Sequence, residues 1–120
     1  MLARKADGDE KAMRLLAGNP EIDDETVGFH AQQAIEKRLK AVLSANDVPF
    51  EPKHPLAPLL ELLAGAGIEA PPGADWIDDL TIYAVPMRYE QLLDAEPLDR
   101  EAVVALVDQV GEWAARLIDA

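Results

Sequence analysis

The apolar side chains of residues 23–45 recur with the period of an α-helix, about 3.6 residues per turn. Asp23 or Asp24 can cap the free N–H groups at the start of this segment, and Asn46-Asp47 offers an exit. We therefore predict a helix from one of these aspartates to Ala45. Its apolar arc consists of Val27, Ala31, Ile35, Leu39, Val42 and Leu43.

The opposite arc of this helix is polar and carries His30, Gln33, Lys37, Lys40 and Ser44. Two interpretations are open. The arc can be a solvated surface, on which Glu36 and Lys40 form an ordinary i, i+4 support pair. It can also be an anion-binding wall, in which the lysines supply charge and the glutamine reads a polar edge.

Two polar residues, Gln32 and Arg38, fall on the apolar arc. A buried glutamine usually bonds a carbonyl of a neighbouring helix, and an arginine near the edge of a core pairs with a carboxylate. The alternative is a polar contact inside a dimer interface or a cleft, because buried polar groups must be satisfied.

Proline and glycine divide the rest of the chain into further helical segments, and nothing reads as a strand. The first of these segments has Leu2, Ala6, Met13, Leu15 and Leu16 as its apolar members, and the fourth has Trp76 or Ile77, Leu80 and Ala84. We predict a single all-α domain over residues 1–120, an up-and-down bundle of four to five helices. The expected helices cover about 2–17, 55 or 58 to 64, 75–85 and 99–118, and "MRYEQLLDAEP" is partly helical or irregular.

Composition excludes several classes of protein. Cysteine is absent, so there are no disulfides or thiolate metal sites, and a cytoplasmic location fits. The two histidines, His30 and His54, lack the Glu-x-x-His spacing of a helical di-metal site, and we expect no metal and no cofactor. No apolar run reaches the roughly 20 residues of a membrane span. The net charge of −12 opposes bulk nucleic-acid binding, although a local cationic pocket remains possible.

The segment "YAVPMRYEQ" gathers a cation and two rings in a chain with few aromatic residues. Arg88 lies between Tyr83 and Tyr89. Arginine suits phosphate, and tyrosine suits stacking on a base. Alternatively, the tyrosines are core residues with hydrogen-bonded tips, and Arg88 is their salt-bridge partner.

Several of these segments together resemble the HEPN family, the "higher eukaryotes and prokaryotes nucleotide-binding" domain. The resemblance covers about Asp23 to Tyr89, with compatible helices on both sides. Its most specific part is "FHAQQAIEKRLKA". "KHPL" stands where the family often has a Thr-His-Asp-like helix start, and "YAVPMRY" stands where it has Tyr-Ala followed shortly by Arg-Tyr.

The resemblance implies a helical bundle that commonly dimerises, so that two copies form a shared cleft. Many members of the family are encoded with small nucleotidyltransferases as two-component toxin–antitoxin systems. Catalytic members are metal-independent ribonucleases that use an arginine, four to six intervening residues and a histidine. In that chemistry, arginine stabilises charge on the phosphate and histidine handles protons.

This sequence departs from the ribonuclease motif. From Arg88 the histidine would fall at 93–95, where the sequence reads Leu-Asp-Ala. Neither His30 nor His54 follows an arginine at the required distance. Asp94 is a poor replacement, because an ordinary carboxyl group is ionised at neutral pH.

The resemblance therefore implies a non-catalytic or degenerate HEPN domain. It would be a homodimer that binds a nucleotide or nucleotide-like ligand, or the partner of a small nucleotidyltransferase. Arg88 would hold phosphate, Lys37 would add charge, Tyr89 would stack or pack, and His30 is a lesser candidate. Two alternatives are an endoribonuclease with an atypical site, such as Arg88 with His30, and a purely structural dimer in which Arg88 makes only internal salt bridges.

Overall fold

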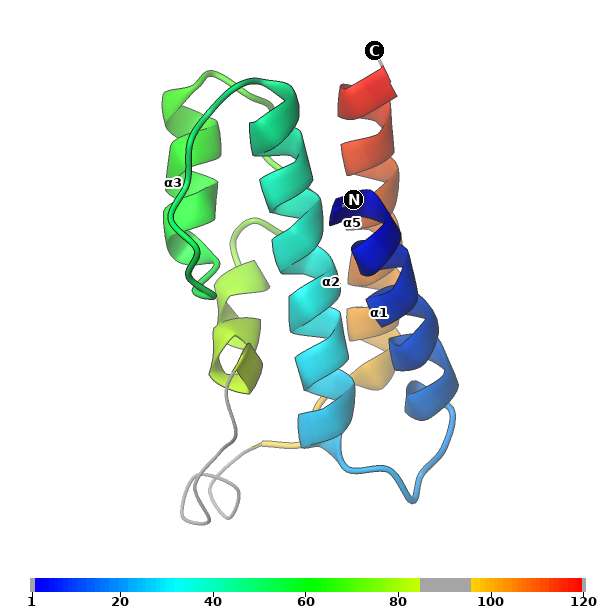
Figure 1. Cartoon of the computed structure of the whole chain (residues 1–120). Helices are drawn as coiled ribbons and strands as arrows, with labels where there is room; N and C mark the ends of the chain where they lie inside the picture. Colours follow the sequence, from blue (N-terminus) through cyan, green and yellow to red (C-terminus); the bar gives the residue numbers. More distant parts are fainter. Residues whose placement is uncertain (1, 85–95, 120) are drawn as a thin grey trace.

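The computed structural model describes residues 2–84 and 96–119, and this part of the chain contains helices and no strand. The predicted all-α class is therefore confirmed. The helices are arranged around a long central member (Figure 1). In chain order they are α1 (Leu2–Ala17), α2 (Asp24–Ala45), α3 (Ala57–Gly65), the 3-10 helix η1 (Ile77–Ala84) and α5 (Arg100–Asp119).

Helix α2 lies between α3 and η1 on one side and α1 and α5 on the other (Figure 1). Every residue of the predicted apolar arc is fully buried. Gln32, which falls on that arc, is also buried, and the buried set extends past the arc to Glu36 and Lys40, because neighbouring elements cover α2 on more than one side. A solvated surface is therefore the wrong interpretation for Lys40, which is 8% exposed.

Helix α2 begins at Asp24 because Asp23 caps it. The Asp23 carboxylate accepts hydrogen bonds from the backbone N–H of Thr26 at 2.7 Å and from its hydroxyl at 2.6 Å. The predicted boundaries are confirmed at both ends. After Ala45 the chain turns through Asp47, whose φ of 56° is in the left-handed region that asparagine and aspartate tolerate.

Replacing Asp23 with alanine should lower the free energy of unfolding by about 1 kcal/mol at neutral pH. The hydrogen bonds from Thr26 lower the pKa of Asp23 in the folded state. The benefit is therefore present above the unfolded pKa and is lost as the pH falls through the folded pKa. Urea denaturation should show that Asp23→Ala is less stable than the wild type at pH 7 and that this difference in stability disappears at pH 2.5. Glu21→Ala, which removes an exposed carboxylate just before the cap, is the matched control.

The element η1 is a 3-10 helix, whereas the sequence predicted an α-helix over about 75–85. A 3-10 helix has three residues per turn, so side chains at i and i+3 align. Ile77, Leu80 and Tyr83 have this spacing and are all buried. Tyr83 therefore replaces Ala84 on the buried face. Among the apolar members of α1, Ala6 and Met13 are buried, whereas Leu15 is 79% exposed.

Helix α5 lies within one residue of the limits predicted for the last helix. Asp99 caps it by accepting a hydrogen bond from Ala102 N at 3.1 Å. Leu106, Val110 and Trp113 are buried in the common core. The indole N–H of Trp113 donates to the carbonyl of Glu69 at 3.1 Å, so this large core residue also satisfies its polar atom.

Gly28 allows η1 to approach α2 closely. A Cβ at this position would lie 2.5 Å from Cγ of Tyr83. Gly28→Ala should therefore destabilise the fold by about 1–3 kcal/mol, because the buried ring has to shift. Gly8→Ala, in α1 with nothing within 4 Å, should instead stabilise by up to about 1 kcal/mol through helix propensity. Chemical denaturation of both variants checks the packing, and equal stabilities would contradict it.

Candidate functional site

Two of the four predicted ligand-binding residues, Arg88 and Tyr89, lie outside the described residues, as do the residues 93–95 at which the motif histidine would fall. Their roles remain predictions. Tyr83, the first residue of the "YAVPMRYEQ" segment, lies within the described residues and is buried. Burial raises the pKa of Tyr83, and the negative charge of Asp24 raises it further.

The other two predicted residues, His30 and Lys37, lie together on α2 and contact α1. Nδ1 of His30 is 3.2 Å from Oδ1 of Asp9, and the ammonium group of Lys37 pairs with Oδ2 of the same carboxylate. The Asp9 side chain is only 14% exposed. In this arrangement the anion that His30 and Lys37 contact is a carboxylate of their own chain.

Gln32 and Arg38 are polar residues within or beside the core, and each has partners. Gln32 is fully buried and its amide donates to the carbonyl of His54 at 2.8 Å, in a loop rather than a neighbouring helix. Arg38 is 14% exposed and pairs with Asp7 at 2.5 Å and Glu10 at 3.3 Å, both on α1. These internal partners match the structural interpretation of both residues.

A buried charged cluster lies on α2 beside the loop that precedes α3. The Glu36 side chain is 4% exposed, and its carboxylate contacts Nδ1 of His54 at 2.9 Å and Nζ of Lys40 at 3.6 Å. Lys40 also lies over the ring of Phe50, 5.6 Å from its centroid. A buried carboxylate is costly unless paired, so these two partners are what make its position tolerable.

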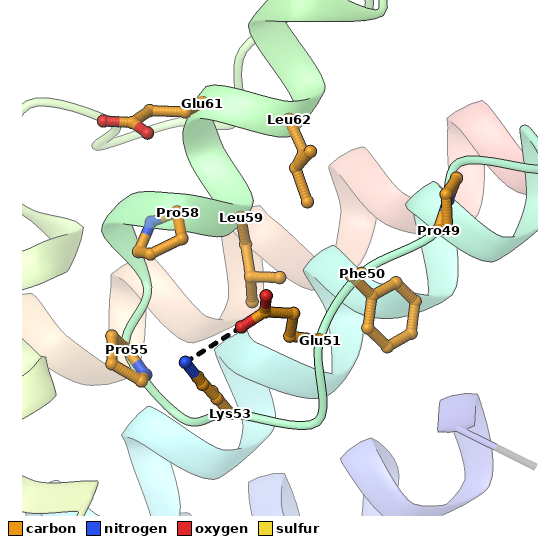
Figure 2. A pocket seen from close by; sticks show the side chains of 9 residues that line it. All are labelled: Pro49, Phe50, Glu51, Lys53, Pro55, Pro58, Leu59, Glu61 and Leu62. Atoms are coloured by element: carbon orange, nitrogen blue, oxygen red, sulfur yellow. Dashed lines mark ion pairs between the residues drawn. The ribbon is translucent and has the colours of Figure 1, made fainter.

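The loop of residues 46–56 runs back alongside α3 before that helix begins (Figure 1). A cavity of about 600 Å³ lies between them, with Phe50, Leu59 and Leu62 among its apolar lining residues. Figure 2 shows the ion pair of Glu51 and Lys53 along the loop side of this cavity, with nitrogen and oxygen 2.9 Å apart. The lining also contains a second carboxylate, Glu61.

Two smaller cavities border η1. One, of about 400 Å³, is lined by Pro52, Lys53, His54, Pro55, Thr81 and Ala84. The other, of about 350 Å³, includes the acidic residues Asp79, Glu96 and Asp99 in its lining. Among the described lining residues of these three cavities, those of the cavity at His54 include two basic side chains and no carboxylate.

Residues 2–84 and 96–119 contain no candidate metal site and no candidate membrane span. In those ranges no group of three or more acidic or histidine side chains is placed to hold a metal ion. Within the same ranges, no helix combines the length and apolar character that crossing a bilayer requires.

Sequence reasoning missed the pair of Glu36 and His54. Glu36 was considered only as the partner of Lys40 on a solvated face, and His54 was considered only as a metal ligand and as the histidine of the ribonuclease motif. The "KHPL" segment was the available signal, because it places a histidine between two prolines just before a helix. Helical periodicity cannot indicate which loop residue reaches a glutamate 18 positions earlier.

The fold and this arrangement define a class of small all-α bundles with a long, largely buried second helix. The sequence matches the HEPN domain over residues 1–117. The chain therefore belongs to the HEPN domain family, and the match extends beyond the Asp23–Tyr89 resemblance to include α1 and nearly all of α5. Comparison with curated proteins and with solved structures gives no significant match.

Proposed function

We propose that the chain is a non-catalytic or degenerate HEPN domain, which forms a homodimer and binds a nucleotide or nucleotide-like ligand. The observation that carries this proposal is a HEPN sequence without the Arg and His spacing of the family's ribonucleases. Arg88 is the residue proposed to hold phosphate, with Tyr89 stacking or packing beside it. Lys37 and His30 are weaker candidates, since both already contact Asp9.

The same proposal includes a partner: a small nucleotidyltransferase, encoded with this chain as a two-component toxin–antitoxin pair, in the cytoplasm. Family membership supports this part. Co-expression with a nucleotidyltransferase encoded next to this chain should give a stable complex that survives gel filtration. Separate elution of the two proteins at micromolar concentration would contradict the partnership.

An RNA-cleavage assay separates the proposal from the endoribonuclease alternative. Purified protein incubated with labelled single-stranded RNA in EDTA should leave the RNA intact, because the general acid–base histidine at 93–95 is missing. Cleavage that disappears in Arg88→Ala would overturn the non-catalytic assignment. Cleavage that survives in Arg88→Ala would indicate a contaminating nuclease and would call for repurification before the conclusion is drawn.

Sedimentation equilibrium tests the homodimer. The chain should sediment at twice its 13.1 kDa mass at micromolar concentration. A monomer at these concentrations would contradict a shared cleft between two copies.

A further inference from the structure

One ring nitrogen of His54 contacts a carboxylate of the chain, and the other is available to a ligand. Nδ1 of His54 is 2.9 Å from the Glu36 carboxylate. An ionised carboxylate accepts hydrogen bonds and donates none, so Nδ1 carries the proton. Nε2, on the other edge of the ring, has no hydrogen-bond partner among the described residues.

Pairing with Glu36 does not bury the ring. The Glu36 side chain is 4% exposed, whereas the His54 side chain is 55% exposed. Lys40 already provides a positive partner for the same carboxylate. A histidine present only to neutralise Glu36 would gain from burial, and this one instead lines a cavity of about 400 Å³.

The backbone around His54 is fixed from two directions. Its carbonyl accepts a hydrogen bond from the fully buried Gln32 amide at 2.8 Å. Two residues later, Leu56 N donates to the Thr81 hydroxyl of η1 at 3.2 Å. Prolines on both sides, Pro52 and Pro55, restrict the remaining backbone freedom. The ring is therefore pre-organised, which reduces the entropic cost of binding a ligand.

The cavity at His54 favours an anion. Its lining residues within 2–84 and 96–119 include Lys53 and His54 and no carboxylate, in a chain of net charge −12. Lys53 pairs with Glu51, but both side chains are 74% exposed. An exposed pair of this kind is weak, so the ammonium group can turn to a competing phosphate at little cost. Clefts focus the field of such local charges.

We propose that Nε2 of His54 donates a hydrogen bond to a phosphate group in this cavity, with Glu36 as its positioning residue and Lys53 as a second cation. The proposal rests on the nucleotide binding proposed above and names the phosphate contact within it. A phosphate at Nε2 stabilises the imidazolium form, in which both ring nitrogens donate.

Imidazole nitrogen NMR of the full chain tests this contact directly. The chain has only two histidines, so the signals of His54 are easily told apart from those of His30. Without ligand, the His54 ring should show the Nδ1–H tautomer. Inorganic pyrophosphate and ADP should each shift Nε2 of His54 toward its protonated position, while adenosine should have no effect. An equal response to adenosine, a response of His30 alone, or no response to either phosphate would overturn the proposal.

Variants show whether His54 contacts the phosphate or only supports the fold. His54→Gln should weaken pyrophosphate and ADP binding at least about tenfold, the effect of losing one charge-assisted hydrogen bond. Arg116→Gln, which removes an exposed cation on α5 that lines none of the cavities described above, is the control and should bind as the wild type does. Glu36→Gln should leave His54 present but weaken binding and return the ring to a mixture of tautomers. Circular dichroism confirms folding of each variant, and a His54→Gln protein that is folded and binds normally would refute the contact.

The two proposals can fail separately. If ADP binds and Arg88→Ala abolishes binding while His54→Gln does not, the phosphate contact at His54 is wrong and the nucleotide-binding function stands. If neither ADP nor pyrophosphate binds the wild type, both proposals fall. Equal affinity for pyrophosphate and ADP would support the contact and indicate that free phosphate groups suffice.

Discussion

Arg100→Met is expected to lower the free energy of unfolding by about 2–4 kcal/mol, since one guanidinium ties three elements together. Its Nε donates to Asp24 at 3.0 Å, at the start of α2. Its Nη1 donates to the carbonyls of Ala17 at 3.2 Å and Asn19 at 3.0 Å, at the end of α1, and Nη2 donates to the carbonyl of Ile22. The last carbonyls of a helix have no partner within it, so this side chain satisfies groups that α1 leaves free.

Arg116→Met is the matched control, because Arg116 is on the same helix and also forms a two-pronged contact. It pairs with Glu69 at 3.0 and 2.7 Å, but its side chain is 58% exposed. Exposed pairs contribute little, so this variant should unfold at nearly the wild-type urea concentration. Arg100→Lys should lose much of the stability as well, since a single ammonium cannot reproduce the planar fork. Equal midpoints for Arg100→Met and Arg116→Met would contradict the bridging role.

The second large effect is expected at Glu36. Glu36→Leu should destabilise the fold by about 3 kcal/mol, because it leaves Lys40 buried without its carboxylate partner. Lys40 is 8% exposed, and its remaining contact is the ring of Phe50. Changing both residues, in Glu36→Leu with Lys40→Met, should recover much of that loss, since apolar groups of similar size often replace a buried ion pair without penalty.

Urea denaturation of the wild type, the two single variants and the double variant forms a complete cycle. The two residues should be coupled by more than about 1 kcal/mol, as expected for charges in direct contact. His54→Gln should cost clearly less than Glu36→Leu, because more than half of the His54 side chain is exposed. If the destabilisations caused by Glu36→Leu and Lys40→Met simply add, the two residues do not form a buried pair, and the Lys40 ammonium group reaches solvent in the absence of Glu36.

Helix limits were predictable because local chemistry determines them. Asp23 caps the helix that follows it, and this position was one of two that the sequence analysis identified from side-chain type and spacing. The 3-10 geometry of η1 was not predicted, although the three-residue spacing of Ile77, Leu80 and Tyr83 favours it. A short apolar segment with this spacing fits either helix type until its packing partner is known.

The candidate site was predictable only in part, because it depends on which elements cover α2. Periodicity correctly separated Gln32 from the ordinary apolar residues, and its full burial confirms this. The same method placed Lys40 on a solvated arc, because it assumes that one face of a helix is wet. The contact of His54 with Glu36 joins a loop to a helix, and no local pattern encodes such a contact.

Calorimetric titration of ADP into the wild type and Arg88→Ala is the decisive test of the proposed nucleotide binding. We expect saturable binding to the wild type and an affinity at least about tenfold lower in Arg88→Ala, because a guanidinium bound to phosphate contributes a charge-assisted contact. Heats indistinguishable from buffer dilution in the wild type, or identical binding by the two proteins, would contradict it.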